Sequence, residues 1–256
     1  MDAKIIKNKK GQIAIWVVIS LILIFMISLL FFLKKDPKSK NTDEFNPGVF
    51  INSCVEEAVK DAIGKMLPQG GFMEPKNYKL YNNTKIEYIC ENKGYFNSCI
   101  NQHPLFLDEI KREILEYVKP KLDACFSTMK KELEEKNYQV ETDIGTLKAN
   151  LENGKILLYL NKNMTIKKNE ESRKFEEFEF EITTNIYDLA NVAIDTAGQE
   201  AKYCYFEYVG YMLLHPEFNI RKTTLSESTK IYSIKSKKSQ EEINIAIRGC
   251  AIPPGI

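Results

Sequence analysis

The chain has 256 residues, of which 44% are hydrophobic, and its formal net charge is +1. That hydrophobic fraction is ordinary for a globular protein and too low for a protein with many membrane spans. Residues 1–40 carry eight Lys against two Asp, a net charge of +6, and the remaining residues carry −5. A mildly acidic domain lacks the basic surface that binds a phosphate backbone, so nucleic acid is not an expected partner.

Residues 13–33 form an apolar run, IAIWVVISLILIFMISLLFFL, which contains no charge, Pro or Gly. As a helix rising about 1.5 Å per residue, the run would span about 31 Å, which matches a hydrocarbon core of about 30 Å. A buried core helix would carry a polar stripe, and a cleaved secretory signal has a shorter apolar core followed by small residues. We therefore predict one transmembrane helix over 13–33 in the lipid bilayer, a basic leader over 1–12 and a juxtamembrane linker over 34–47.

The charges beside this run do not set its orientation, because four Lys precede it and four follow it. The segment KKGQIAIWVV, residues 9–18, resembles the processing region of archaeal type IV pilin-like (class III) precursors. That resemblance implies cleavage between Gly11 and Gln12 and a hydrophobic helix that stays in the mature protein. Many such pilins carry Glu where this chain has Trp16, which departs from the pattern of a polymerising subunit. An uncleaved signal anchor is the alternative, and both readings place the N-terminus inside and the domain outside.

All six cysteines follow the apolar run, which indicates disulfides and an oxidising compartment. No CxxC is present and the two histidines bear no regular relation to the cysteines, so no metal site and no cofactor is expected. Six reduced, buried cysteines in a cytosolic domain are the alternative. Six cysteines allow fifteen connectivities. Locality and helix faces favour the pairs Cys90–Cys99, Cys54–Cys125 and Cys204–Cys250.

Two sequons, Asn82-Asn83-Thr84 and Asn163-Met164-Thr165, make Asn82 and Asn163 candidate glycosylation sites. Both are compatible with a domain outside the membrane.

Helical periodicity predicts a helix over 50–66 and a longer one over 105–135, kinked or split at Pro120. Between them, residues 78–89 are predicted to form a hairpin around the Asn82-Asn83-Thr84 turn. Eight further strands and one helix are predicted after residue 135. Strands are expected over 138–144, 146–151, 155–160, 164–168 and 175–183, a helix over 186–214 broken near Gly198, and strands over 218–225, 230–235 and 242–248.

These elements predict the α+β class, with helices and an antiparallel sheet in a soluble domain over 48–256 that disulfides hold together. Two subdomains with a boundary near residue 136 are a possible division of that domain. A further resemblance, to a group of archaeal membrane-anchored surface proteins, lies in the KKGQ before the apolar run, Cys54-Val55-Glu56, Gln69-Gly70-Gly71-Phe72 and the later helix with Cys125. It implies a location at the cell surface and implies no activity.

Candidate chemistry is sparse, since the chain has no Walker A, GxGxxG, HExxH or GxSxG motif. His103 and His215 each precede a Pro, which favours capping or turn roles. Gly70 and Gly71 are expected to supply a turn with positive φ. Alternating glutamates on a strand are typical of a solvated face. The aromatics cover several faces of a helix, so most of them are expected in the core, and a contact surface formed by a few of them is the alternative. The residues concerned are Glu170, Glu171, Glu176, Glu177, Glu179 and Glu181, and Tyr203, Tyr205, Phe206, Tyr208 and Tyr211.

Three functions are open at this point. The first is a non-enzymatic surface protein that binds a protein partner or an envelope component, or associates with itself. The second is a minor pilin-like subunit of a surface filament. The third is an extracytoplasmic hydrolase that uses dispersed carboxylates, which would require a cleft with two carboxyls about 5–10 Å apart. The anchor, the paired cysteines and the missing catalytic motifs favour the first, and no catalytic residue is assigned.

Overall fold

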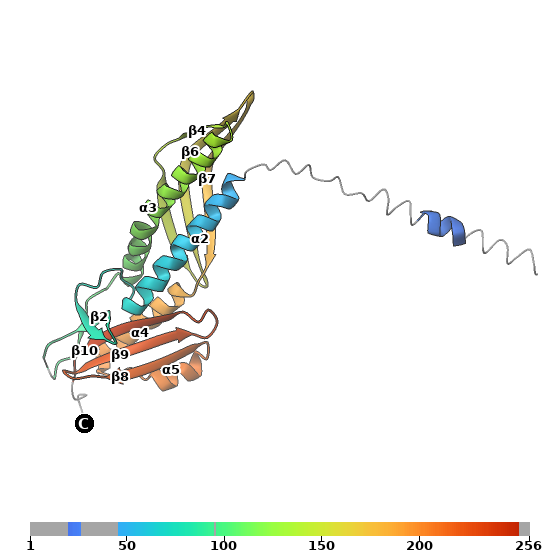
Figure 1. Ribbon diagram of the computed structural model, residues 1–256. Helices are drawn as coiled ribbons and strands as arrows, with labels where there is room; N and C mark the ends of the chain where they lie inside the picture. The colour runs from blue at the N-terminus through green and yellow to red at the C-terminus, as the bar shows by residue number, and fades with distance from the viewer. Residues whose placement is uncertain (1–19, 27–45, 95, 251–256) are drawn as a thin grey trace, which may run out of the picture. The chain divides into compact units, whose positions relative to one another are not determined.

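The computed structural model describes residues 20–26, 46–94 and 96–250 (Figure 1). The chain divides into two units, Met1–Asn46 and Pro47–Ile256. Within the described ranges, no helix is both long enough and apolar enough to cross a membrane.

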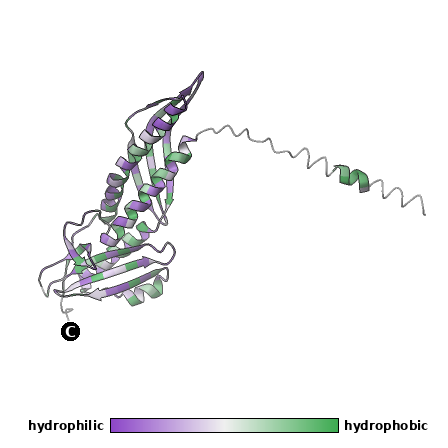
Figure 2. Ribbon diagram, viewed as in Figure 1, coloured by the Kyte–Doolittle hydropathy of each residue, from purple (hydrophilic) through white to green (hydrophobic). Residues whose placement is uncertain are grey.

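In the N-terminal unit, the described residues 20–26 form a hydrophobic helical stretch (Figure 2), and Asn46 is the unit's other described residue. The helical stretch covers part of the apolar run at 13–33. The rest of that run, together with the leader 1–12, Gly11, Gln12 and the linker up to residue 45, lies outside the described residues.

The larger unit has the α+β architecture, and its described residues form two sheets and four α-helices. In the first sheet the long strand β6 pairs with β7 along one edge and with β5 and β4 along successive halves of the other, always antiparallel. Two helices, α2 and α3, lie side by side along this sheet (Figure 1). These elements are α2 (Pro47–Met66), α3 (Phe106–Glu135), β4 (Gln139–Thr142), β5 (Thr146–Glu152), β6 (Lys155–Lys168) and β7 (Glu171–Thr183).

The second sheet has the strand order β1-β2-β10-β9-β8, with the short strand β3 paired to β2. Helix α4 packs against β9, β10 and β2, and the short helix α5 packs beside β8. Their bounds are β1 (Tyr78–Tyr81), β2 (Thr84–Glu91), β3 (Ile100–Asn101), α4 (Ile186–Tyr203), α5 (Tyr208–Leu214), β8 (Phe218–Thr224), β9 (Thr229–Ser236) and β10 (Glu242–Arg248). A one-turn 3₁₀ helix, η1 (Leu67–Gln69), follows α2.

The second sheet corrects the expectation of a purely antiparallel sheet, because β10 and β2 run parallel. A parallel pair needs a long connection, and here almost the whole domain lies between the two strands. Strands from either side of residue 136 therefore share one sheet.

Helix α2 begins at Pro47, three residues before the predicted start, since Pro is favoured at the first helical position. Helix α3 buries one residue per turn along a single stripe, as its periodicity indicates. Pro120 lies inside α3 and is exposed, and the helix continues through it, which corrects the predicted split. Val118 and Leu122, on either side of Pro120, are both buried, so the buried stripe of α3 continues past the proline.

Two boundaries differ from the prediction in the second half of the chain. The strands expected over 155–160 and 164–168 are one strand, β6, whose pairing with β7 shifts register between Asn161 and Met164. The helix expected over 186–214 breaks at Cys204, where φ is 56°, and Gly198 lies inside α4. Backbone conformation at Cys204, which periodicity does not report, sets this break.

Several turns agree with the sequence. Asn82 and Asn83 have φ values of 48° and 62° in the β1–β2 hairpin, and Gly154 has a φ of 75° between β5 and β6. Such left-handed conformations favour Asn and Gly, which is why these pairs indicated hairpins.

Candidate functional site

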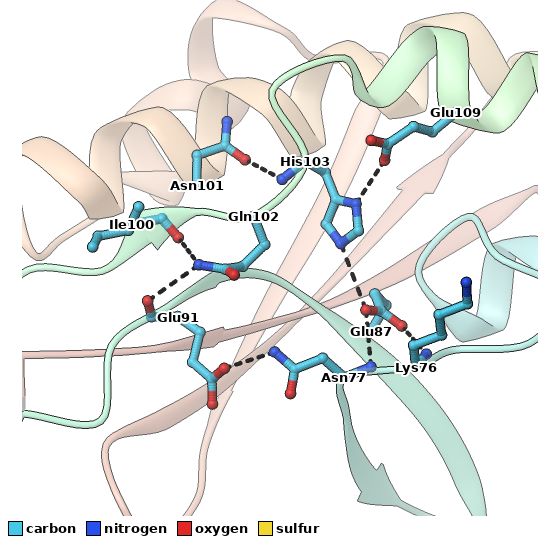
Figure 3. A network of polar contacts seen from close by, with 9 residues as sticks. All are labelled: Lys76, Asn77, Glu87, Glu91, Ile100, Asn101, Gln102, His103 and Glu109. Atoms are coloured by element: carbon cyan, nitrogen blue, oxygen red, sulfur yellow. Dashed lines mark hydrogen bonds and ion pairs between the residues drawn. The ribbon is translucent and has the colours of Figure 1, made fainter.

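His103 is the centre of a polar cluster that joins three parts of the domain (Figure 3). Its Nδ1 lies 2.6 Å from Oε2 of Glu109, in the first turns of α3, and its Nε2 lies 3.6 Å from Oε1 of Glu87 on β2. The ring of Phe72 lies against the imidazole at a centroid distance of 4.6 Å. The sequence indicated a capping or turn role for His103, and the fold adds two carboxylates, one from β2 and one from the first turn of α3.

Glu87 is almost completely buried, and backbone groups satisfy its carboxylate. The backbone N–H groups of Lys76 and Asn77 donate to its two oxygens at 2.7 and 3.1 Å. Gly70 and Gly71, at φ values of 84° and 90°, lead the chain into this region, as their turn role predicted. A Cβ on Gly70 would lie 3.1 Å from Cβ of Glu87, so the turn needs glycine to approach β2.

Burial of the imidazole lowers the pKa of His103, but the carboxylates of Glu87 and Glu109 outweigh burial and raise that pKa above its ordinary 6.5. The two carboxylates therefore favour the protonated form of the buried His103 imidazole. The cluster fastens the start of α3 to β2 and to the loop before β1.

A raised pKa makes the stability of the domain depend on pH. His103 contributes stability that is fully present below its unfolded pKa and is lost as the pH rises through its folded pKa. We expect the difference in unfolding free energy between the wild type and His103→Gln to shrink as the pH rises above the ordinary histidine pKa of about 6.5. Urea unfolding of both proteins at each pH measures it, with His215→Gln as the matched control. A difference that grows with pH would contradict this assignment.

Three disulfides pair all six cysteines. Cys54–Cys125 joins α2 to α3, Cys90–Cys99 closes a short loop after β2, and Cys204–Cys250 ties the end of α4 to the residues after β10. These are the pairs that locality and helix faces favoured. Cys90, Cys99, Cys204 and Cys250 are buried, whereas Cys54 and Cys125 are half-buried.

The two sequons occupy different environments. Asn82 is exposed in the hairpin turn between β1 and β2. Asn163 is exposed as well, but its Nδ2 donates to Oδ2 of Asp143 at 2.6 Å and its backbone N–H donates to Oδ1 at 2.9 Å. Asp143 thus holds the amide that a glycan would modify.

His215 is the C-cap residue of α5, in agreement with its predicted capping role, and its ring stacks on Tyr211 at 4.3 Å. The aromatics near it correct the expectation of a largely buried set. Phe206 is buried, whereas Tyr203 and Tyr205 are 56% and 41% exposed. The helix ends at Cys204, and Tyr208 begins a second helix. The faces of one continuous helix therefore do not predict which of these aromatics are buried.

A second buried charge lies under the second sheet, at Glu200 of α4. Lys230 of β9 places its Nζ 2.5 Å from Oε2 of Glu200, and the hydroxyl of Tyr232 donates to Oε1. Burial and the charge of Glu200 raise the pKa of Tyr232, which keeps that hydroxyl protonated as a donor. Lys230 also donates to the carbonyl oxygen of Cys204 at 2.9 Å, which links this pair to the third disulfide.

The outer face of the first sheet carries a hollow of about 610 Å³. On β7, Phe178, Phe180 and Ile182 are buried toward the helices and Glu177, Glu179 and Glu181 are exposed, as the alternation predicted. The strand register places two rows of side chains across this face. The first row is Lys148, Tyr159 and Glu179, and the second is Thr146, Asn161 and Glu177. We call these six residues the sheet-face grid.

The sequence predicted that Glu177 and Glu179 lie on a solvated strand face. It did not indicate the other four residues of the sheet-face grid. Alternation along β5 and β6 could place Lys148 and Tyr159 on outward faces. Only the pairing register brings them opposite each other and next to Glu179. Comparisons with models of protein families, with curated proteins and with solved structures found no match for this chain.

Proposed function

We propose that this chain is a single-pass membrane protein whose α+β domain lies outside the membrane and binds another molecule, without an enzymatic role. The apolar run at 13–33 supports the anchor, and its length suits one span. The proposed location rests on one observation above all, that every cysteine of the domain is in a disulfide. Disulfides of this number persist in oxidising compartments and are rare in reducing ones.

The experiment is peptide mass spectrometry on native membranes, with free thiols alkylated before lysis. The proposal expects all six cysteines to resist alkylation until a reductant is added. An abundant cytosolic protein with free thiols, followed in the same sample, is the control for reagent entry. Cysteines that are alkylated without reduction would overturn the extracytoplasmic location.

A minor pilin-like subunit is the second candidate, because KKGQIAIWVV resembles a prepilin processing region. The same mass spectra test it. A mature N-terminus at Gln12 together with the chain in isolated surface filaments would favour this candidate. An N-terminus that retains Met1 or Asp2 would favour a plain signal anchor.

Outside the membrane, Asn82 is expected to carry a glycan and Asn163 to remain largely unmodified. The reason is that Asn82 lies exposed in a turn, whereas the amide of Asn163 is bound to Asp143. Glycopeptide mass spectrometry of the native protein measures occupancy at each site. Thr84→Ala and Thr165→Ala remove one sequon each and are the paired controls. Higher occupancy at Asn163 than at Asn82 would contradict the expectation.

A further inference from the structure

The sheet-face grid places an aromatic ring at the centre of an exposed, polar sheet surface. Tyr159 is 42% exposed and lies in the middle strand, with Lys148 directly opposite on β5 and Glu179 directly opposite on β7. Asn161, two residues further along β6, has Thr146 and Glu177 as its own cross-strand partners. Directly opposite side chains lie about 5 Å apart at Cβ, so the six groups form a compact surface.

The polar side chains of the sheet-face grid have no hydrogen-bond or ion-pair partner within the described parts of the chain. Lys155 of β6 pairs with Glu181 of β7, and Lys174 pairs with Glu176 within β7. Across residues 46–94 and 96–250, no hydrogen bond or ion pair engages the side chains of the six grid residues. Their donors and acceptors are therefore available to a ligand in the hollow.

The chemistry of these groups suits a sugar ring. A pyranose has apolar C–H faces and a rim of hydroxyls, each of which both donates and accepts. The ring of Tyr159 offers a flat apolar surface, and Asn161, Glu177 and Glu179 offer an amide and carboxylate oxygens beside it. Lys148 adds a cationic donor on the opposite side of the ring from Glu179. Donors and acceptors of both charges thus surround one aromatic platform.

Other ligand classes fit the sheet-face grid less well. A cation would meet the carboxylates of Glu177 and Glu179, but Lys148 shares the same face and opposes it. An apolar peptide would find little apolar surface, because among the described residues that line the hollow Tyr159 is exposed whereas Leu160 and Phe178 are buried. The hollow volume lies within the range of about 300–1,000 Å³ that small-molecule sites occupy.

We propose that the sheet-face grid binds a neutral saccharide, with a pyranose stacked on Tyr159 and its hydroxyls bound by Asn161, Glu177, Glu179 and Lys148. This inference rests on the proposed binding function and names its ligand class. The saccharide could belong to a structural polysaccharide or to the glycan of a glycoprotein, since the pyranose chemistry is shared.

The test uses the full-length protein in lipid nanodiscs with three probes: cellohexaose, chitohexaose and a high-mannose N-glycan. Saturation-transfer difference NMR detects binding, and titration gives the dissociation constant. We expect at least one probe to bind, with strong transfer to the C–H protons of one pyranose face. Binding of the first two probes points to a polysaccharide, and binding of the third points to a glycoprotein glycan.

Variants locate the site. Tyr159→Ala is expected to weaken binding about tenfold or more, while Tyr159→Phe keeps the ring and stays within about threefold of the wild type. Tyr78→Ala is the matched control, because Tyr78 is 41% exposed on the other sheet. Asn161→Ala, at a second exposed position, gives an independent loss should Tyr159→Ala fail to fold.

No binding of any probe at about 10 mM, or binding that Tyr159→Ala and Asn161→Ala leave unchanged, would overturn the saccharide site. Binding of oligolysine in place of the sugars would also overturn it, in favour of a site for cations. The sugar-binding test uses purified protein, whereas the thiol-labelling test uses native membranes. Absence of sugar binding would therefore leave the proposed extracytoplasmic location unaffected. Alkylation of the cysteines without reductant would likewise leave the proposed saccharide site unaffected.

Discussion

Loss of the Cys54–Cys125 disulfide is expected to lower the unfolding free energy of the domain by about 4 kcal/mol. The bond closes a loop of 71 residues, and in the chain-entropy model a longer loop restricts the unfolded chain more. The two cysteines are half-buried between α2 and α3, so alanines there leave little cavity. Urea unfolding of Cys54→Ala/Cys125→Ala against the wild type, both without reductant, measures the loss.

The other disulfides supply the matched comparison. Cys204–Cys250 closes 46 residues and Cys90–Cys99 closes 9, which predicts losses of about 4 and about 2–3 kcal/mol from loop length alone. Four of these cysteines are buried, so removal of either bond adds a packing cost to the loop term. An effect of Cys54→Ala/Cys125→Ala below about 1 kcal/mol would show that the helix pair is already restrained in the unfolded chain.

The second large effect is expected from Lys230→Met, which should destabilise the domain by about 3–5 kcal/mol. Glu200 is 1% exposed at its side chain, and Lys230 is the cation that neutralises it. Removal of one partner of a buried ion pair leaves the other charge buried without a counter-ion. Its desolvation penalty is then no longer offset by electrostatic attraction. Thermal and urea unfolding of the variant measure the change.

The double variant Glu200→Leu/Lys230→Met is the control that separates charge from packing. It removes both charges and is expected to recover most of the stability that Lys230→Met loses. Tyr232 would lose its acceptor in the double variant, so recovery should remain incomplete. If Lys230→Met costs no more than the exchange of an exposed lysine such as Lys202, the pair is not a buried charge in solution.

Local patterns predicted most elements of the domain, because their causes lie within a few residues. The stripe of α3, the alternation of β7 and the Asn and Gly turns follow from short-range geometry. Errors arose where a distant contact overrides a local preference. Pro120 stays inside α3 because the helix is packed on both sides of it, and the break after α4 falls at Cys204.

The same distinction holds for the disulfides and the buried ion pairs, some of which the sequence predicted and some of which only the fold revealed. The three disulfides could be chosen among fifteen connectivities, since locality and helix faces limit which cysteines can meet. No pattern placed Glu87 and Glu109 on either side of His103, nor Lys230 beside Glu200. Those residues come from different elements of the fold. Their burial makes the loss of one charged partner costly in unfolding free energy.

The sequence by itself indicated the class of the domain, favoured its three cysteine pairs and predicts an anchor over 13–33, because these depend on composition, spacing and length. Only the tertiary structure decided that β2 and β10 run parallel and that His103 is held between two carboxylates. The same holds for the sheet-face grid, because register, which one residue of slip would reverse, sets which side chains share a face. Contacts between residues far apart in the chain define these features, and a linear pattern does not record them.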